Sequence, residues 1–324
     1  MKFIPYLLPL LFFASSLQAD EIKLHGAIHA DRDISAAAFF GDKLLIGSDE
    51  AVGDGKNENY IQLLERNGDN YQISHDILIY RGGNQQGHEL DIEGVAVEGQ
   101  RIYVTGSHAL VRKRIKPDKS DQKNLIRLAT IKAEPARKQI FRITLNSNLE
   151  LVDRTSISLA DIIANDPILS PFAAIPSKEN GIDIEGIAVK DGLTYLGFRG
   201  PVLRDGFVPV LQLKFDQPEK HYRLYWLNLG GLGIRDMTAV GDGFLILAGP
   251  VAEVPNDYRL YHWNGNDSLA DHKNLKQLLQ INPSEGGSKP EAVAIELETE
   301  HHYRILLLHD GIKGGSPKRY TIPR

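Results

Sequence analysis

Glu93-Gly-Val-Ala-Val97 and Glu185-Gly-Ile-Ala-Val189 are two copies of one short segment, and three more stretches follow the same pattern. These are Ser35-Ala-Ala-Ala-Phe39, Asp236-Met-Thr-Ala-Val240 and Glu291-Ala-Val-Ala-Ile295. Each copy is followed by a short polar break and a second apolar run, which is typical of a β-hairpin. Because self-similarity along a chain indicates a repeat architecture, the five copies predict five structural units.

Two further strands are predicted in each unit. A third run alternates apolar and polar residues, as in Ile140-Phe-Arg-Ile-Thr-Leu145 and Tyr258-Arg-Leu-Tyr-His-Trp263, which is the pattern of a half-buried strand. A fourth run follows in every unit except the last, which ends after Arg319-Tyr-Thr-Ile322. Four strands in roughly fifty to sixty residues is typical of a β-propeller. We therefore expect an all-β propeller of five four-stranded blades.

The N-terminal run Ile22–Ile28 has no hairpin partner in the sequence. It can supply the missing outer strand of the fifth blade, which would join the two chain ends and leave no open sheet edge. A propeller of six blades is the alternative. Its extra blade would have to lie within residues 108–138 or 155–182, and both stretches are too charged or too helix-like for that.

Residues 1–19 have the features of a secretory signal peptide. Lys2 precedes the apolar run Phe3–Phe13, and Leu17-Gln18-Ala19 fits a small-residue cleavage site. The apolar run is too short to span a bilayer, and no later stretch is long and apolar enough to do so. The chain has no cysteine, which excludes disulfides and thiolate metal sites. We expect export to the periplasm, cleavage after Ala19, and one propeller domain over residues 20–324.

The chain is mildly acidic, with 37 Lys and Arg against 42 Asp and Glu. A nucleic-acid-binding protein needs a basic footprint, so a nucleic acid is not an expected partner. Residues 112–138 are the exception, with ten basic residues against three acidic ones. This stretch is either a solvated loop or a basic rim that attracts anionic substrates toward the acidic axis.

Long connections concentrate on one face of the predicted propeller. With strands running antiparallel from the axis outward, that face carries the starts of the innermost strands and the ends of the second ones. It also carries two insertions, residues 109–138 and 157–182, and the second begins with a short predicted helix over Ser158–Ala164. Long loops on one side of a rigid scaffold are where function usually concentrates.

The same face gathers polar residues from several blades. An acidic residue opens the innermost strand in four units, at Glu93, Glu185, Asp236 and Glu291. The ends of the second strands contribute Asp49, His108, Arg199 and Asp310. Four more charged residues lie one or two positions before these four acids, namely Asp91, Asp183, Arg235 and Lys289. Because strand residues two apart share a side, Asp91 pairs with Glu93 and Asp183 with Glu185.

Three interpretations of these carboxylates are open. They can hold a hard cation, and calcium suits them best because it accepts six to eight oxygen ligands in loose geometry. They can instead bond backbone N–H groups or pair with Arg199, Arg235 and Lys289, with no ligand at all. Without a cation, crowding would raise the pKa of some of them and make one a general acid or base.

The segments Asp91-Ile-Glu-Gly-Val-Ala96 and Asp183-Ile-Glu-Gly-Ile-Ala188, together with Thr105-Gly-Ser-His108 and Gly197-Phe-Arg-Gly-Pro201, resemble an uncharacterised family of exported bacterial proteins. That family is known only as a domain of unknown function, so the resemblance implies a shared architecture over most of the chain and no reaction. A looser likeness is to calcium-dependent propeller hydrolases, namely the phytase-like esterases and the gluconolactonase and paraoxonase lactonases. The glutamate that usually opens the first blade of the lactonases is replaced here by Ser35.

We therefore expect an axial pocket that binds a cation and a small anionic ligand, and that hydrolyses a phosphoester, an ester or a lactone. The expected metal ligands are Glu93, Glu185, Asp236 and Glu291, and the expected ligand contacts are Asp91, Asp183, Arg235 and Lys289. Catalytic roles are expected for Asp49, His108, Arg199 and Asp310, with a metal-polarised water as nucleophile. The alternative is a non-catalytic propeller whose looped face binds a protein or an envelope polysaccharide.

Overall fold

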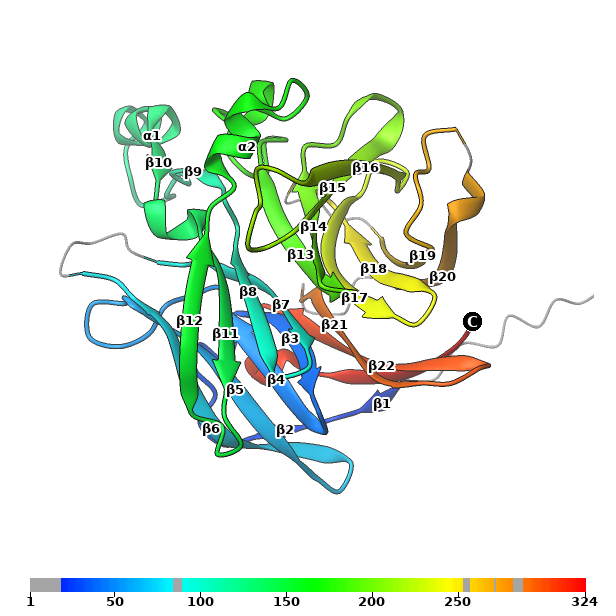
Figure 1. The fold of residues 1–324 in the computed structure, drawn as a ribbon. Coiled ribbons are helices and arrows are strands. Elements are labelled where there is room, and N and C mark those ends of the chain that lie inside the picture. The colour runs from blue at the N-terminus through cyan, green and yellow to red at the C-terminus, as the bar shows by residue number, and fades with distance from the viewer. Residues whose placement is uncertain (1–18, 84–88, 253–256, 271, 282–287) are drawn as a thin grey trace, which may run out of the picture.

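The computed structural model describes residues 19–83, 89–252, 257–270, 272–281 and 288–324. The predicted signal peptide, residues 1–19, lies outside the described residues except for Ala19. The five sequence repeats form five blades around one axis, with the innermost strands β3, β7, β13, β17 and β21 converging at the centre of Figure 1.

Each blade has four antiparallel strands, which confirms the predicted propeller, and β2 (Leu24–His25) adds a short parallel strand to the first blade. The first blade contains β3 (Ile34–Phe40), β4 (Lys43–Ser48), β5 (Glu58–Asn67) and β6 (Asn70–Arg81). The second contains β7 (Ile92–Glu98), β8 (Arg101–Gly106), β11 (Ile140–Leu145) and β12 (Leu151–Ile157). The third contains β13 (Asp183–Lys190), β14 (Leu193–Gly200), β15 (Phe207–Leu213) and β16 (Tyr222–Asn228). The fourth contains β17 (Gly233–Val240), β18 (Gly243–Gly249), β19 (Tyr258–Trp263) and β20 (Leu275–Ile281).

The fifth blade contains β21 (Lys289–Glu298), β22 (His302–Asp310), β23 (Lys318–Pro323) and the N-terminal β1 (Asp20–Glu21). The expected closure by the N-terminus is confirmed, but the closing strand is β1 rather than the run Ile22–Ile28. Ile22 is buried in the apolar cluster between the fifth and first blades. The chain then continues as β2 (Leu24–His25), which pairs in parallel with β6, so the N-terminal segment connects the last blade to the first.

The two insertions contain no sixth blade. The first carries β9 (Leu110–Arg112), α1 (Asp121–Ala129), β10 (Ile131–Ala133) and a 3₁₀ turn, Pro135–Lys138. β9 and β10 pair only with each other. The second insertion carries α2 (Ala160–Asn165), which confirms the predicted helix, and a 3₁₀ turn, Ser170–Phe172. Further 3₁₀ turns are Arg204–Gly206, His272–Asn274 and Lys313–Gly315. Within the described ranges, no helix has the length and apolar character needed to cross a bilayer.

The core consists of five apolar clusters, one between each pair of adjacent blades. Close approach of the inner strands explains the glycines of the repeated D-I-E-G segment. A Cβ on Gly94 would lie 2.7 Å from the backbone oxygen of Glu185, and one on Gly186 would lie 2.9 Å from Ile234. Glycine therefore lets neighbouring inner strands pack tightly around the axis.

Candidate axial carboxylate site

A β-bulge at the start of each inner strand leaves one residue without a cross-strand partner. In the second blade, Ile92 pairs with Gly106 and Gly94 with Thr105, so Glu93 is the unpaired residue. The same shift occurs in every blade, and it defines five equivalent positions: Ser35, Glu93, Glu185, Arg235 and Glu291. Such bulges redirect side chains, and here they bring three glutamates and one arginine to the mouth of the axis.

Arg235, not Asp236, occupies the axial position of the fourth blade, which corrects the sequence-based alignment. Ile234 pairs with Ala248 and Asp236 pairs with Leu247, so Arg235 is the bulged residue. The carboxylate of Asp236 instead accepts hydrogen bonds from the backbone N–H groups of Met237 (2.8 Å) and Val293 (2.7 Å). Because a shift of one residue reverses the side of a strand, Asp236 is directed away from the ring. It links β17 to β21 of the next blade.

The carboxylates of the third and fifth blades are paired with arginines. Arg235 lies between Glu185, at 3.1 Å, and Glu291. Arg199 Nη1 lies 2.7 Å from Glu185 and 3.8 Å from Asp183. Burial, reinforced by the charge of Glu185, raises the pKa of both Asp183 and Glu291 to about 7, although the neighbouring arginines oppose this. This half of the ring is a buried ion-pair network.

In the first and second blades, Asp49 and Glu93 lack such an arginine partner, whereas Asp91 has one in Arg137. Oxygen atoms of Asp49, Asp91 and Glu93 lie within 4.8 Å of one another. Asp49 Oδ1 is buried without a hydrogen-bond partner, and within the described part of the chain no donor bonds to Glu93. Burial, followed by repulsion from Asp91, raises the pKa of Asp49 and of Glu93 well above the ordinary range. We call Asp49, Asp91 and Glu93 the acidic triad.

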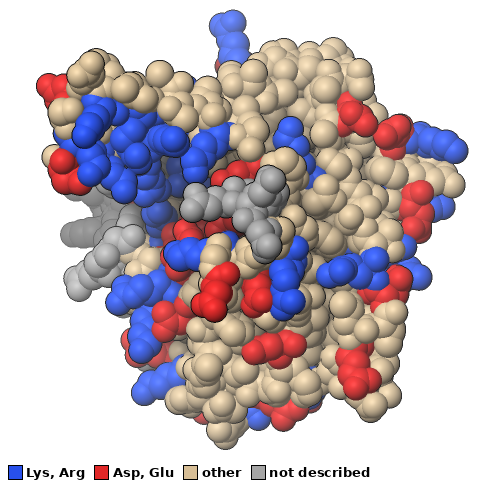
Figure 2. Space-filling model, turned by 90° about the vertical axis from the view of Figure 1, so that its left-hand side faces the viewer, with Lys and Arg blue, Asp and Glu red and all other residues tan. Residues whose placement is uncertain are grey.

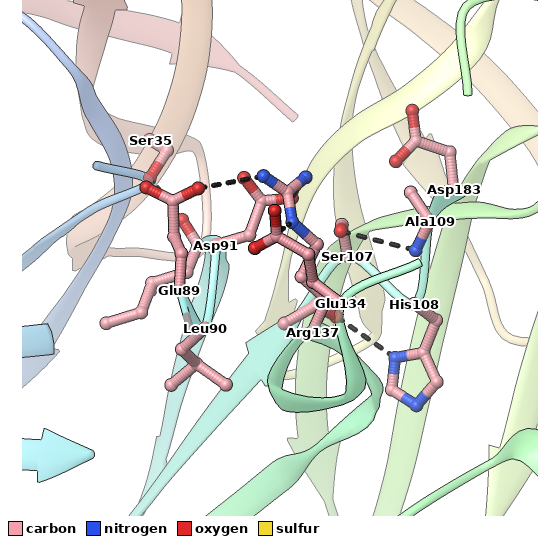
Figure 3. A network of polar contacts seen from close by, with 12 residues as sticks. Ser35, Glu89, Leu90, Asp91, Ser107, His108, Ala109, Glu134, Arg137 and Asp183 are labelled. Carbon is pink, nitrogen blue, oxygen red and sulfur yellow. Dashed lines mark hydrogen bonds and ion pairs between the residues drawn. The ribbon is translucent and has the colours of Figure 1, made fainter. Parts of the chain in front are cut away.

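Arg137 enters the site from the first insertion, as Figure 3 shows. It donates hydrogen bonds to Asp91 (2.6 Å) and Glu89 (2.8 Å), and Glu134 lies 3.7 Å from its Nε. Burial, reinforced by Asp91, raises the pKa of Glu89 to about 7. Sequence reasoning missed Arg137, Glu89 and Glu134 as individual residues. The only signal was the basic insertion expected near the acidic axis.

The ring nitrogens of His108, which was expected to have a catalytic role, have their partners outside this site. Its Nδ1 lies 3.1 Å from the backbone oxygen of Gly106, and its Nε2 accepts the N–H of Leu159 at 3.3 Å. In Figure 3 the ring points away from the carboxylates around Arg137. Burial lowers the pKa of His108 to about 4, so the ring is neutral and holds the second insertion against the second blade.

Lys289 and Asp310 lie together at the edge of the axial mouth. Lys289 Nζ and Asp310 Oδ2 are 3.7 Å apart, and both side chains are partly exposed. After burial and Asp91, the charge of Asp310 is the next factor that raises the pKa of Asp49. Asp310 therefore belongs electrostatically to the side of the mouth that holds the acidic triad.

Beyond the carboxylates, the axis is narrow and apolar. A cavity of about 100 Å³ there is lined by residues of all five inner strands, which include Ala38, Val97, Ala188, Ala239 and Ile295. The carboxylates therefore have apolar side chains on one side and the looped face on the other.

Without a bound cation, the protein is expected to be less stable at pH 7.5 than at pH 5. Asp183, Glu291 and Glu89 have folded-state pKa values of about 7 because of burial, against roughly 4 when unfolded. The folded chain binds more protons in this interval, so stability is lost as pH rises from about 4.5 to 7. Urea unfolding in EDTA should show a fall of at least about 2 kcal/mol. A free energy of unfolding that rises over this interval would contradict the assignment of these pKa values.

One family model matches the sequence over most of its length. The family described as "Protein of unknown function (DUF3616)" matches residues 33–320. No curated protein matches the sequence.

Three solved structures that the chain resembles have low sequence identity and low TM-scores. An exo-β-1,3-galactanase from Phanerochaete chrysosporium has 10% identity and a TM-score of 0.48, over 95% of this chain and 64% of that one. The chain thus spans less than two thirds of the galactanase. YjhT has 11% identity and a TM-score of 0.44, over 90% and 81%. A glucose dehydrogenase has 12% identity and a TM-score of 0.40, over 87% and 78%. These likenesses are too distant to support an argument about activity.

Proposed function

The chain belongs to the DUF3616 family of proteins of unknown function, and we propose that it binds calcium together with a small anionic ligand at the mouth of the propeller axis. The predicted signal peptide would deliver it to the periplasm. The proposal concerns the acidic triad and Arg137, which lie side by side on the looped face.

The acidic triad is the observation that carries the proposal. Asp49 and Glu93 have no arginine partner, which is costly for carboxylates shielded from water, and a cation would remove that cost. Calcium binds oxygen ligands at about 2.3–2.6 Å, so oxygens within 4.8 Å of one another can share one ion. Glu185 and Glu291, also expected as metal ligands, already have arginine partners, and Asp236 has two backbone N–H groups. The proposed ligand set is Asp49 and Glu93, which have no arginine partner, together with Asp91, which bonds Arg137 but lies within 4.8 Å of both.

Arg137 supports the anionic half of the proposal. Its Nε is buried without a hydrogen-bond partner, although two of its other nitrogens bond Glu89 and Asp91. The Arg137 guanidinium and a cation beside it would together offer two positive groups to a phosphate or carboxylate. Calcium, when bound, would polarise a phosphoryl or carbonyl oxygen, and Glu89 would accept a proton near neutral pH because burial raises its pKa to about 7. Hydrolysis of a phosphoester, ester or lactone is the reaction that this set would serve.

Calcium titration of EDTA-treated protein, followed by thermal unfolding at pH 7.5, tests the proposal. At calcium concentrations about a hundredfold above Kd, the melting temperature should rise by roughly 5 °C. Glu93→Gln and Asp49→Asn should abolish this rise. Each should also raise the melting temperature of the calcium-free protein, because each removes a repelling charge. Glu50→Gln is the control, since Glu50 is exposed and next to Asp49 but pairs with Lys56.

Absence of any shift with calcium, or an unchanged shift in Glu93→Gln, would contradict the cation site. The shift should also be smaller at pH 5 than at pH 7.5, because the triad must lose protons to bind metal. The catalytic part has its own test, which is turnover of generic phosphoester, ester and lactone substrates by the calcium-loaded protein. Binding without turnover would favour the non-catalytic alternative, in which the looped face binds a protein or polysaccharide.

A further inference from the structure

Residues 110–133 form an arm that projects from the second blade at the upper left of Figure 1. The arm consists of β9, α1 and β10, and β9 and β10 pair only with each other. None of the residues of α1 is buried. The axial site described above uses no residue of the arm.

Large aliphatic side chains on the arm face solvent. Leu125 and Ile126, both on α1, are 65% and 64% exposed. The other members of this group are Ile115, Leu128 and Ile131. A surface helix normally turns its apolar side toward the core. Contiguous exposed apolar residues on a folded chain mark an interaction surface.

Polar side chains, not apolar ones, fasten α1 to the rest of the arm. Asn124 bonds the backbone of Lys116 and Lys119, and Arg127 Nε donates to the backbone oxygen of Arg114 at 2.5 Å. Arg112 donates to Glu179 of the second insertion at 2.5 and 2.9 Å. The helix is therefore held with its aliphatic side chains outward.

Basic residues are numerous on the same arm. The arm contains eight Lys and Arg against Asp118 and Asp121, in a chain whose net charge is −5. Figure 2 shows a dense group of Lys and Arg side chains on the face that it displays. No aromatic residue occurs in the arm, and single-stranded nucleic acids are usually held by aromatic stacking. Aliphatic side chains interspersed with cations match the headgroup region of an anionic lipid bilayer.

We propose that the arm docks the protein on the surface of a membrane that contains anionic lipids. Ile115, Leu125 and Ile126 enter the boundary between headgroups and acyl chains, and the lysines and arginines of the arm contact lipid phosphates. Because Arg137 follows β10 by four residues, docking brings the axial mouth close to the bilayer.

Vesicle sedimentation tests this proposal. Residues 20–324 are mixed with vesicles of phosphatidylcholine and phosphatidylglycerol in equal parts, and the protein that sediments with them is measured. Binding should be at least about tenfold weaker to vesicles of phosphatidylcholine alone. It should also fall as NaCl rises from 0.1 to 0.5 M, because salt screens the attraction between the arm and the anionic lipids. The double variant L125S/I126S should bind the anionic vesicles at least about tenfold more weakly, since two aliphatic side chains no longer insert. K116E/K123E should bind the anionic vesicles more weakly by a similar factor.

The control is L151S/V152S on the edge strand β12, which also removes two exposed aliphatic side chains but lies outside the arm. It should bind vesicles like the unmodified protein. Circular dichroism and the melting temperature establish that every variant is folded. Equal binding of L125S/I126S and the unmodified chain, or binding to a nucleic acid in place of vesicles, would overturn the proposal. Calcium binding by L125S/I126S should be unchanged, so failure of this proposal is separable from failure of the axial site.

Discussion

Replacing Arg235 with methionine is expected to lower the free energy of unfolding by about 3–5 kcal/mol at pH 7.5. Arg235 is buried at the axis, where it pairs with Glu185 and Glu291. Methionine leaves both carboxylates without this partner in a site from which water is largely excluded. Removing one member of a buried ion pair is costly mainly because the other charge stays behind.

The loss should be smaller at pH 5, which gives the prediction a second readout. Burial raises the pKa of Glu291 to about 7 even with Arg235 present, so without Arg235 this carboxyl is protonated readily in mild acid. Urea unfolding at both pH values measures the difference. Arg223→Met is the control, because Arg223 is 57% exposed and its pair with Asp267 contributes little. A loss at pH 7.5 no larger than that of the control would show that the network does not stabilise the ring.

Replacing Asp236 with alanine is expected to cost about 3 kcal/mol of unfolding free energy. The substitution leaves the N–H groups of Met237 and Val293 without acceptors in a buried position. It also removes a direct link between the innermost strands of two blades. Asp236→Asn should cost less, because its amide oxygen can still accept one of the two hydrogen bonds.

Urea unfolding in EDTA measures this effect apart from any metal. Asp42→Ala is the control, since Asp42 is 92% exposed in the turn after β3. Calcium should stabilise Asp236→Asn as it stabilises the unmodified protein, because Asp236 is not a member of the acidic triad. Loss of the calcium response in Asp236→Asn, with an otherwise normal unfolding transition, would return Asp236 to the ligand set.

Asp91 and Glu93 are residues that the sequence pattern correctly placed close together. Residues two apart on a strand share a side, so the sequence alone predicted that these carboxylates act together, and Asp49 was expected at the same level. All three meet within 4.8 Å. The sequence placed all three at strand ends on one face, but it assigned them to different roles and did not group them as one set.

Arg235 and His108 show where local pattern failed. The alignment of Asp236 with the glutamates depended on sequence similarity, but the bulge that every inner strand carries falls on Arg235 in the fourth blade, so Asp236 is the next residue and takes the other side. The partners of His108 include Leu159, which is distant in the sequence. Neither the exact position of a bulge nor a contact across an insertion leaves a periodic signal in the residues involved.

The sequence by itself determined five blades, their four strands, the closure through the N-terminus and the face that carries the insertions. These features follow from alternation, turn residues and repeat spacing, all of which act over short stretches of chain. Only the tertiary structure decided which carboxylates are neutralised, because Arg199, Arg235 and Arg137 reach their partners from different strands and from an insertion. Coulomb energies depend on distance in space and on burial, not on separation along the chain. The ring of acids predicted from the repeats is therefore two sites in the folded protein, a buried ion-pair network and the triad of Asp49, Asp91 and Glu93, in which only Asp91 has an arginine partner.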